Sequence, residues 1–286
     1  MCNEQQLAHW GRAMLDRRTF GAGTLAAGAA ACAPVGGGAT SRGTALRERT
    51  VSFATGAGTL DGEFFAPETG QHPGVIFWPD IAGIRDAKRQ MARRLAASGH
   101  AVLLANPYYR DVAGQQFEDF ASFAASGGFQ TVRPWRSKFN AETIGLDNRA
   151  AAAWLLEQGE VGSAGKIGVQ GYCMTGAHAL RAPGVHPRII AGASFHGGGL
   201  VTDSADSPHR SLSEDGHYLV AISQDDDAEA PTHDDQLRAM SDEAASLEVE
   251  IYPADHGFCV LDSSSYDEVQ AERAWARLLA LYERAL

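Results

Sequence analysis

The feature that most constrains the fold is the continuous apolar run at residues 74–78. An unbroken apolar run is typical of a strand buried on both faces, as in a parallel sheet. A helix is predicted next, because apolar residues recur at helical spacing and a glycine follows them: Ile84, Ala87, Met91, Leu95 and Gly99. Residues 100–106 return to strand composition. A strand–helix–strand unit of this kind implies a right-handed crossover within a parallel sheet.

The same alternation continues to the end of the chain. Two short strands, near 51–54 and 60–66, precede the first unit. Further strands are predicted near 167–171, 189–194, 218–223 and 247–252. Helices are predicted near 142–158, after Cys173, near 232–245 and near 266–286. The expected fold is therefore α/β, a doubly wound, mostly parallel sheet with helices on both faces.

The segment 111–140 interrupts this alternation. It carries aromatic residues with little periodicity: Phe117, Phe120, Phe123, Phe129, Trp135 and Phe139. Long segments at such a place are often functional. Two interpretations stay open, a packed surface excursion and a cap over an apolar pocket for a small or aromatic substrate.

Composition indicates an ordinary globular enzyme. Apolar residues make up 44% and charged residues 21% of the 286 residues. The formal net charge is −11, and the acidic residues are spread along the chain, so no basic patch for nucleic acid is present. We expect a small-molecule substrate and no nucleic-acid partner.

The first part of the chain has the order of an export signal. Arg17 and Arg18 precede a Gly/Ala-rich run at residues 21–33, which resembles a twin-arginine signal. The run is too short and too weakly apolar to span a membrane. The alternative is an amphipathic surface helix with a chance arginine pair. We therefore predict an export signal at 1–33, a linker at 34–48, a catalytic domain at 49–286, and a periplasmic location.

Cys173 is the candidate nucleophile. It lies in a Gly-x-Cys-x-x-Gly turn that follows the strand near 167–171 and opens a helix. Small neighbours permit the strained turn of a nucleophile elbow, and a helix N-terminus favours the thiolate. The glycine that usually stands two residues after the nucleophile is Thr175 here. The alternative is a buried structural cysteine.

His256 is the candidate base, because it follows the last strand and precedes the C-terminal helix. The acid that orients it should follow the strand near 218–223, where three adjacent aspartates stand, at 225–227. We favour Asp227, four residues before Pro231, with Asp226 as the second choice.

These residues together resemble the dienelactone hydrolase family of the α/β-hydrolase superfamily. The resemblance covers most of residues 60–286 and includes the Trp-Pro-Asp-Ile-Ala-Gly loop at 78–83. It implies an α/β-hydrolase fold, and an oxyanion hole formed by the backbone N–H groups of Ile81 and Met174. We predict that Asp80, Tyr172 and His196 bind substrate; the alternative for His196 is a structural loop residue at a strand end near the site.

Two positions depart from the family pattern. Asp80 stands where the family has a glutamate that contacts the resting thiol, and Val260 stands where it has an arginine for a substrate carboxylate. Arg110, Arg133 and Arg136 are the candidate substitutes for that arginine.

The sequence contains no motif for a metal or a cofactor. No His/Cys/Asp spacing matches a metal site, and no phosphate-cradling glycine loop follows the first parallel strand, so we predict neither a metal nor a cofactor. His196 precedes a run of glycines but comes after the nucleophile, unlike the lipase oxyanion motif. Cys259 could form a disulfide with Cys173 if their Cα atoms lie within about 7 Å.

The predicted function is hydrolysis of a small ester or lactone by a Cys-His-Asp triad, through a thioester acyl-enzyme. The alternatives are a general carboxylesterase or thioesterase, and a catalytically silent fold that binds a ligand.

Cys32 is a candidate lipid anchor, because Ala30-Ala31-Cys32 resembles a lipoprotein processing site. If Cys32 is acylated, the chain incorporates a palmitate analogue and the Cys32→Ser variant does not. The measurement is metabolic labelling of the full chain; an unlabelled wild type would contradict the anchor.

Overall fold

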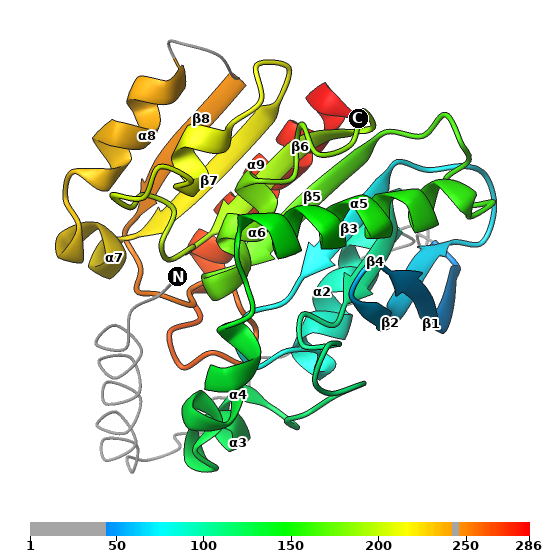
Figure 1. Cartoon of the computed structure of the whole chain (residues 1–286), viewed down its shortest axis with the longest axis horizontal. Helices are drawn as coiled ribbons and strands as arrows, with labels where there is room; N and C mark the ends of the chain where they lie inside the picture. Colours follow the sequence, from blue (N-terminus) through cyan, green and yellow to red (C-terminus); the bar gives the residue numbers. More distant parts are fainter. Residues whose placement is uncertain (1–43, 242–245) are drawn as a thin grey trace, which may run out of the picture.

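In the computed structural model, which describes residues 44–241 and 246–286, an eight-stranded sheet runs through the molecule in the order β1-β2-β4-β3-β5-β6-β7-β8 (Figure 1). The first two strands and β4 pair antiparallel, and all neighbours from β4 to β8 pair parallel. The mostly parallel sheet predicted from the sequence is confirmed.

The strands are β1 (Leu46–Thr55), β2 (Gly58–Pro67), β3 (Gly74–Trp78), β4 (Ala101–Ala105), β5 (Ile167–Tyr172), β6 (Ile189–Phe195), β7 (His217–Ser223) and β8 (Ser246–Tyr252). The main helices are α2 (Asp86–Ala97), α5 (Ala141–Glu157), α6 (Gly176–Leu180), α8 (His233–Ser241) and α9 (Glu268–Ala285). The first strand begins at Leu46, so residues 46–48 belong to the sheet and not to the predicted linker. Its pairing with β2 as far as Pro67 explains the earlier start.

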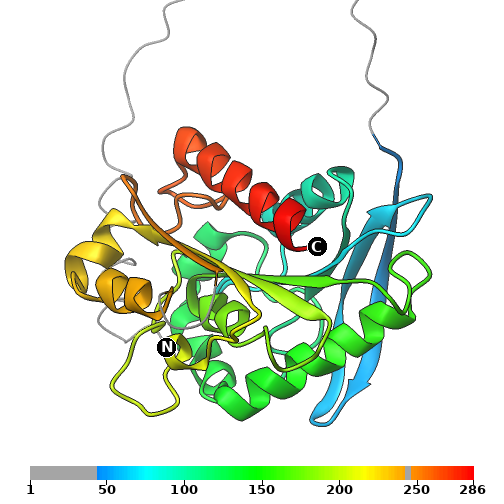
Figure 2. The same ribbon diagram turned by 90° about the horizontal axis from the view of Figure 1, so that it is seen from above.

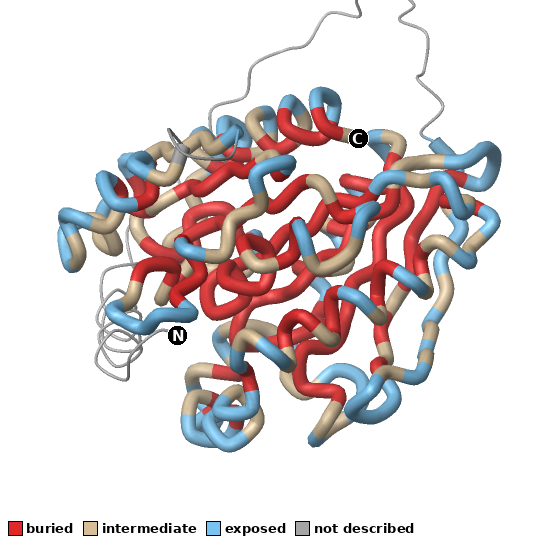
Figure 3. Tube along the Cα trace, turned by 45° about the horizontal axis from the view of Figure 1, so that its top comes forward, coloured by how far each residue is buried: buried red, intermediate tan, exposed pale blue. Residues whose placement is uncertain are grey.

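Helices cover both faces of the sheet (Figure 2). One apolar cluster joins α2 and α9 to the sheet through side chains such as Phe77 and Leu278. Another joins α5 to the opposite face through side chains such as Trp78 and Leu155. The central strands are buried along their length, as Figure 3 shows, and this leaves their carboxyl ends as the place for chemistry.

The interrupting segment folds into two short helices, α3 (Phe120–Ala125) and α4 (Gly128–Arg136). Phe123 and Val132 are fully buried, and they belong to the same apolar cluster as Cys173 and Met174. The segment therefore packs against the carboxyl edge of the sheet, beside the predicted nucleophile.

The predicted export signal and Cys32 lie outside the described residues. Within the described part of the chain, no helix combines the length and apolar character that a membrane crossing requires.

Candidate active site

Cys173 has a strained backbone. It follows β5 directly and has a φ of 55°, the left-handed region that a residue with a Cβ rarely adopts. A short 3-10 turn, η2 (Cys173–Thr175), leads from it into α6. The chain thus turns sharply at the end of a central strand, which is the geometry of a nucleophile elbow.

The flanking glycines are required by close contacts. A Cβ at Gly171 would lie 2.0 Å from the carbonyl oxygen of Thr175. A Cβ at Gly176 would lie 2.4 Å from Ser194 Oγ on the neighbouring strand β6. Both distances are far below van der Waals contact, so the pattern of glycines around Cys173 is a packing requirement.

Thr175, the departure from the usual glycine, stabilises the same turn. Its hydroxyl accepts the backbone N–H of Tyr172 at 2.9 Å. It also lies 3.0 and 2.9 Å from the carbonyl oxygens of Trp78 and Pro79, to one of which it can donate. The hydroxyl therefore links the turn at Cys173 to the end of β3.

The predicted base is held by two aspartates. His256 Nδ1 lies 2.7 Å from Asp226 Oδ2, and the backbone N–H of His256 donates to Asp225 Oδ1 at 2.8 Å. Ser223 donates to the same Asp226 oxygen at 2.6 Å. The preference for Asp227 is thus corrected to Asp226. The acidic segment forms a short helix, α7 (Gln224–Glu229), in which successive side chains point about 100° apart, so Asp227 faces a different direction.

His196 lies against the base. It follows β6 with a φ of 40°, and its Nδ1 is 3.3 Å from Nε2 of His256. The two rings meet nearly edge to face, with centroids 4.5 Å apart. Two residues on, the Gly198 N–H donates to the Cys173 carbonyl at 3.3 Å. The predicted nucleophile and base therefore flank the turn that begins at His196, and His196 packs on the base instead of standing free to bind substrate.

Tyr108 joins the two predicted oxyanion residues and was not anticipated from the sequence. Its hydroxyl donates to the Ile81 carbonyl at 2.7 Å and lies 3.5 Å from Met174 Sδ. Burial raises its pKa well above the usual value, so it remains a neutral donor. Its position shortly after β4, at the carboxyl edge and beside β3, was a signal that could have identified it.

Asp80 is occupied by two buried cations. Its carboxylate lies 2.7 Å from Arg85 Nη1 and 2.7 Å from Lys88 Nζ, and Arg85 also binds Asp262 at 2.7 Å. Burial alone would raise the pKa of Asp80, but the charges of Arg85 and Lys88 hold it well below the usual value. The expectation that Asp80 binds substrate is corrected, because the start of α2 supplies both cations directly after this loop.

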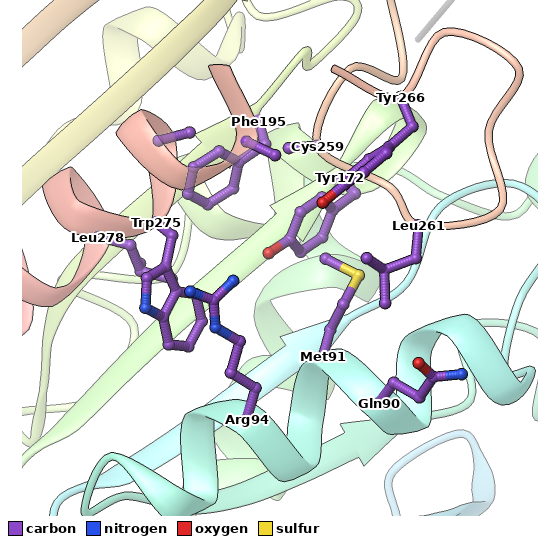
Figure 4. Close-up of a pocket in the computed structure, with 12 residues that line it drawn as sticks. Gln90, Met91, Arg94, Tyr172, Phe195, Cys259, Leu261, Tyr266, Trp275 and Leu278 are labelled. Carbon is purple, nitrogen blue, oxygen red and sulfur yellow. The ribbon is translucent and has the colours of Figure 1, made fainter. Parts of the chain in front are cut away.

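The side chain of Tyr172 also points elsewhere than expected. It stacks on Phe195 with centroids 5.0 Å apart, and Lys88 Nζ lies 4.5 Å above its ring. Tyr172 and Cys259 face a cavity of about 60 Å³ between α2 and α9, shown in Figure 4. The predicted substrate contact is corrected, because the strand's alternation turns this side chain into the core.

Cys259 and Cys173 are both free thiols and belong to different apolar clusters. Burial raises the pKa of Cys259 to about 12. The structure thus has no disulfide between them.

A cavity of about 440 Å³ adjoins Met174, between α4, α5 and α6. Arg136 and Arg181 line it, together with Asp206, whose carbonyl accepts from Arg181. Of the three candidate arginines, Arg110 is bound by both oxygens of Asp147, at 2.7 and 2.8 Å, and Arg133 does not line this cavity. Arg136 is therefore the candidate that faces open space near the site.

Across residues 44–241 and 246–286, no three His, Cys, Asp or Glu side chains form a group that could hold a metal ion.

Similarity to known proteins extends over most of the chain. The sequence profile of the dienelactone hydrolase family matches residues 60–286. A protein from Synechocystis sp. named as a carboxymethylenebutenolidase is 25% identical over 76% of this chain and 88% of its own length. One of the same name from Escherichia coli K12 is 22% identical over 75% of this chain and 78% of its own.

Solved structures share the fold. A dienelactone hydrolase structure from Klebsiella pneumoniae has a TM-score of 0.67 and 23% identity, over 84% of this chain and 99% of that one. A dienelactone hydrolase-like promiscuous phosphotriesterase from metagenomic libraries has a TM-score of 0.61 and 26% identity, over 84% and 98%. From the match over residues 60–286 and this shared architecture, the chain belongs to the dienelactone hydrolase family, a family of ester hydrolases.

Proposed function

We propose that the chain hydrolyses a small ester or lactone with a Cys173–His256–Asp226 triad and a thioester intermediate. The observation that carries the proposal is the hydrogen bond of 2.7 Å between Asp226 and His256. The turn that begins at His196 links this base to the strained cysteine, because it contacts His256 through His196 and Cys173 through Gly198. An aspartate on Nδ1 fixes the tautomer in which Nε2 can accept a proton, and it stabilises the imidazolium that forms.

In the first half of the reaction, His256 Nε2 takes the Cys173 proton and Sγ bonds to the substrate carbonyl carbon. The carbonyl π electrons move to oxygen and give a tetrahedral oxyanion. Its collapse breaks the carbon–oxygen ester bond, and the departing alkoxide takes the proton from His256. In the second half, water gives a proton to His256 and attacks the thioester, which releases the acid and restores the thiol.

The oxyanion would be held by the backbone N–H groups of Ile81 and Met174. Tyr108 supports this role, because its hydroxyl binds the Ile81 carbonyl and contacts the Met174 sulfur, so it fixes both residues together. One such preorganised donor typically contributes about 3 kcal/mol to the transition state.

We further propose that the substrate carries a carboxylate and that Arg136 binds it. Arg136 lines the 440 Å³ cavity beside Met174, and Val260 leaves the family's usual arginine position apolar. Arg181, which the sequence analysis did not single out, is a second cation on the same wall, shared with the Asp206 carbonyl.

Export through the twin-arginine signal, with a periplasmic location and a lipid anchor at Cys32, is proposed from the sequence alone.

Asp226 and Asp227, neighbours in α7, provide a matched test of the triad. Asp226→Asn is expected to lower turnover of an activated acetate ester by about 10²–10⁴-fold, because an amide does not fix the Nδ1–H tautomer. Asp227→Asn should stay within about threefold of the wild type, since Asp227 does not bind His256. Steady-state kinetics checks both, and a larger loss in Asp227→Asn would return the role to that residue.

Cys173→Ala tests the nucleophile. It is expected to abolish hydrolysis of both a dienelactone and an activated acetate ester, because no acyl-enzyme can form. The thioester itself should appear as a mass increase on Cys173 when Asp226→Asn is quenched with substrate. Turnover by Cys173→Ala at the wild-type rate would refute the covalent mechanism.

The charge of the substrate distinguishes a dienelactone hydrolase from a general esterase. Arg136→Met is expected to raise KM for the carboxylated dienelactone by about 10–100-fold, through loss of a charge-assisted contact, and to leave KM for the uncharged acetate unchanged. Arg133→Met, on the same helix, is the control and should change neither. Acetate turnover without dienelactone turnover in the wild type would favour a general esterase instead.

A further inference from the structure

His196 combines two costly features. Its φ of 40° lies in the region that favours glycine, and its side chain is only 1% exposed. Its Nε2 has no hydrogen-bond partner among the residues that the structure describes. Backbone strain and a buried unpaired nitrogen in one residue, next to a catalytic base, indicate a role at the site.

The hydrogen bonds around the two rings fix their protons. Asp226 accepts from Nδ1 of His256, so Nε2 of a neutral His256 carries a lone pair. Nδ1 of His196 lies 3.3 Å from that Nε2, and one of the two nitrogens must donate. His196 is therefore protonated at Nδ1, and its unpaired Nε2 is a bare acceptor.

The surroundings keep His196 neutral. Burial, His256 and Lys88 lower its pKa well below the usual value, against a smaller opposite effect of Asp80. The ring of Tyr172 lies 6.0 Å away on β5, and that of Phe258 lies 6.0 Å away beyond β8. Facing His256 are Asp226 and Asp225 from α7, and His196 from the end of β6. Within residues 44–241 and 246–286 no carboxylate is hydrogen-bonded to His196, so nothing stabilises a second proton on its ring.

We propose that His196 is a positioning residue that restrains the base: its Nδ1–H occupies the Nε2 lone pair of His256 and keeps Cys173 a thiol in the resting enzyme. The inference rests on the proposed function, in which that lone pair receives the Cys173 proton.

Proton transfer from Sγ to Nε2 would place an N–H of His256 opposite the N–H of His196. Two donors repel, so the contact at 3.3 Å has to be given up before or during the transfer. The resting thiolate–imidazolium pair is thereby disfavoured, and a carbonyl held beside Cys173 supplies the stabilisation that makes the transfer favourable.

The test follows the reactivity of Cys173 without any substrate. The full chain is alkylated with iodoacetamide across a pH series, and the Cys173 peptide is quantified by mass spectrometry, which separates it from Cys2, Cys32 and Cys259. His196→Leu removes the donor while it fills the space. His196→Asn keeps an N–H near the position of Nδ1 and tolerates the positive φ.

In His196→Leu, the midpoint of the alkylation profile should move to lower pH by about one unit, which is about tenfold faster modification below both midpoints. His196→Asn should stay near the wild type. A residue that only filled space would move neither profile, so an unchanged midpoint in folded His196→Leu would overturn the proposal.

A second measurement needs no variant that might misfold. Nitrogen-15 NMR of histidine-labelled wild type should show His196 as the Nδ1–H tautomer, still neutral at a pH where an exposed histidine is protonated, its signal assigned by its absence from His196→Asn. The Nε2–H tautomer would overturn the proposal. Neither readout requires turnover, so a failure of the hydrolase function would appear separately, as activity retained in Cys173→Ala.

Discussion

The left-handed backbone of Cys173 is the constraint on which the rest of the site depends. A φ of 55° turns the chain within one residue, so that the thiol stands at the carboxyl edge of the sheet instead of along it. The chain can turn this sharply because two neighbouring residues have no side chain. Gly171 leaves room for the carbonyl of Thr175, and Gly176 leaves room for Ser194 on β6. Thr175 then binds it to the end of β3. These contacts hold the turn at Cys173, the loop 78–83 and the turn that begins at His196 close together.

Charge around the site is arranged in two separate groups. Carboxylates of α7 lie behind His256, where they can stabilise a cation. The second group lies at the loop 78–83, where the carboxylates of Asp80 and Asp262 are paired with the cations of Arg85 and Lys88. Between the two groups stands His196, which is polar yet uncharged. His196 therefore separates the two charged groups without adding a charge of its own.

The strands and the turn at Cys173 could be predicted from the sequence, because each follows from a local pattern of residues. Unbroken apolar runs identified the parallel strands, and the glycines around Cys173 identified the turn, because each pattern answers a local packing demand. The sequence analysis favoured Asp227, whereas Asp226 is the residue that binds His256. The sequence does not show which side of α7 faces His256, because this short helix has no buried residue to mark its inner side. Tyr108 was missed because its role depends on a carbonyl distant in sequence. Tyr172 was also misjudged. It stands next to Cys173 in the sequence, but its side chain packs on Phe195 in the core.

The ion pairs of Asp80 with Arg85 and Lys88 limit which residues can stand at position 80. Arg85 and Lys88 are fully buried, and removing one member of such a group leaves an uncompensated charge, at a cost of about 3–5 kcal/mol. A neutral residue at position 80 would therefore destabilise the fold unless Arg85 and Lys88 were replaced by uncharged residues as well.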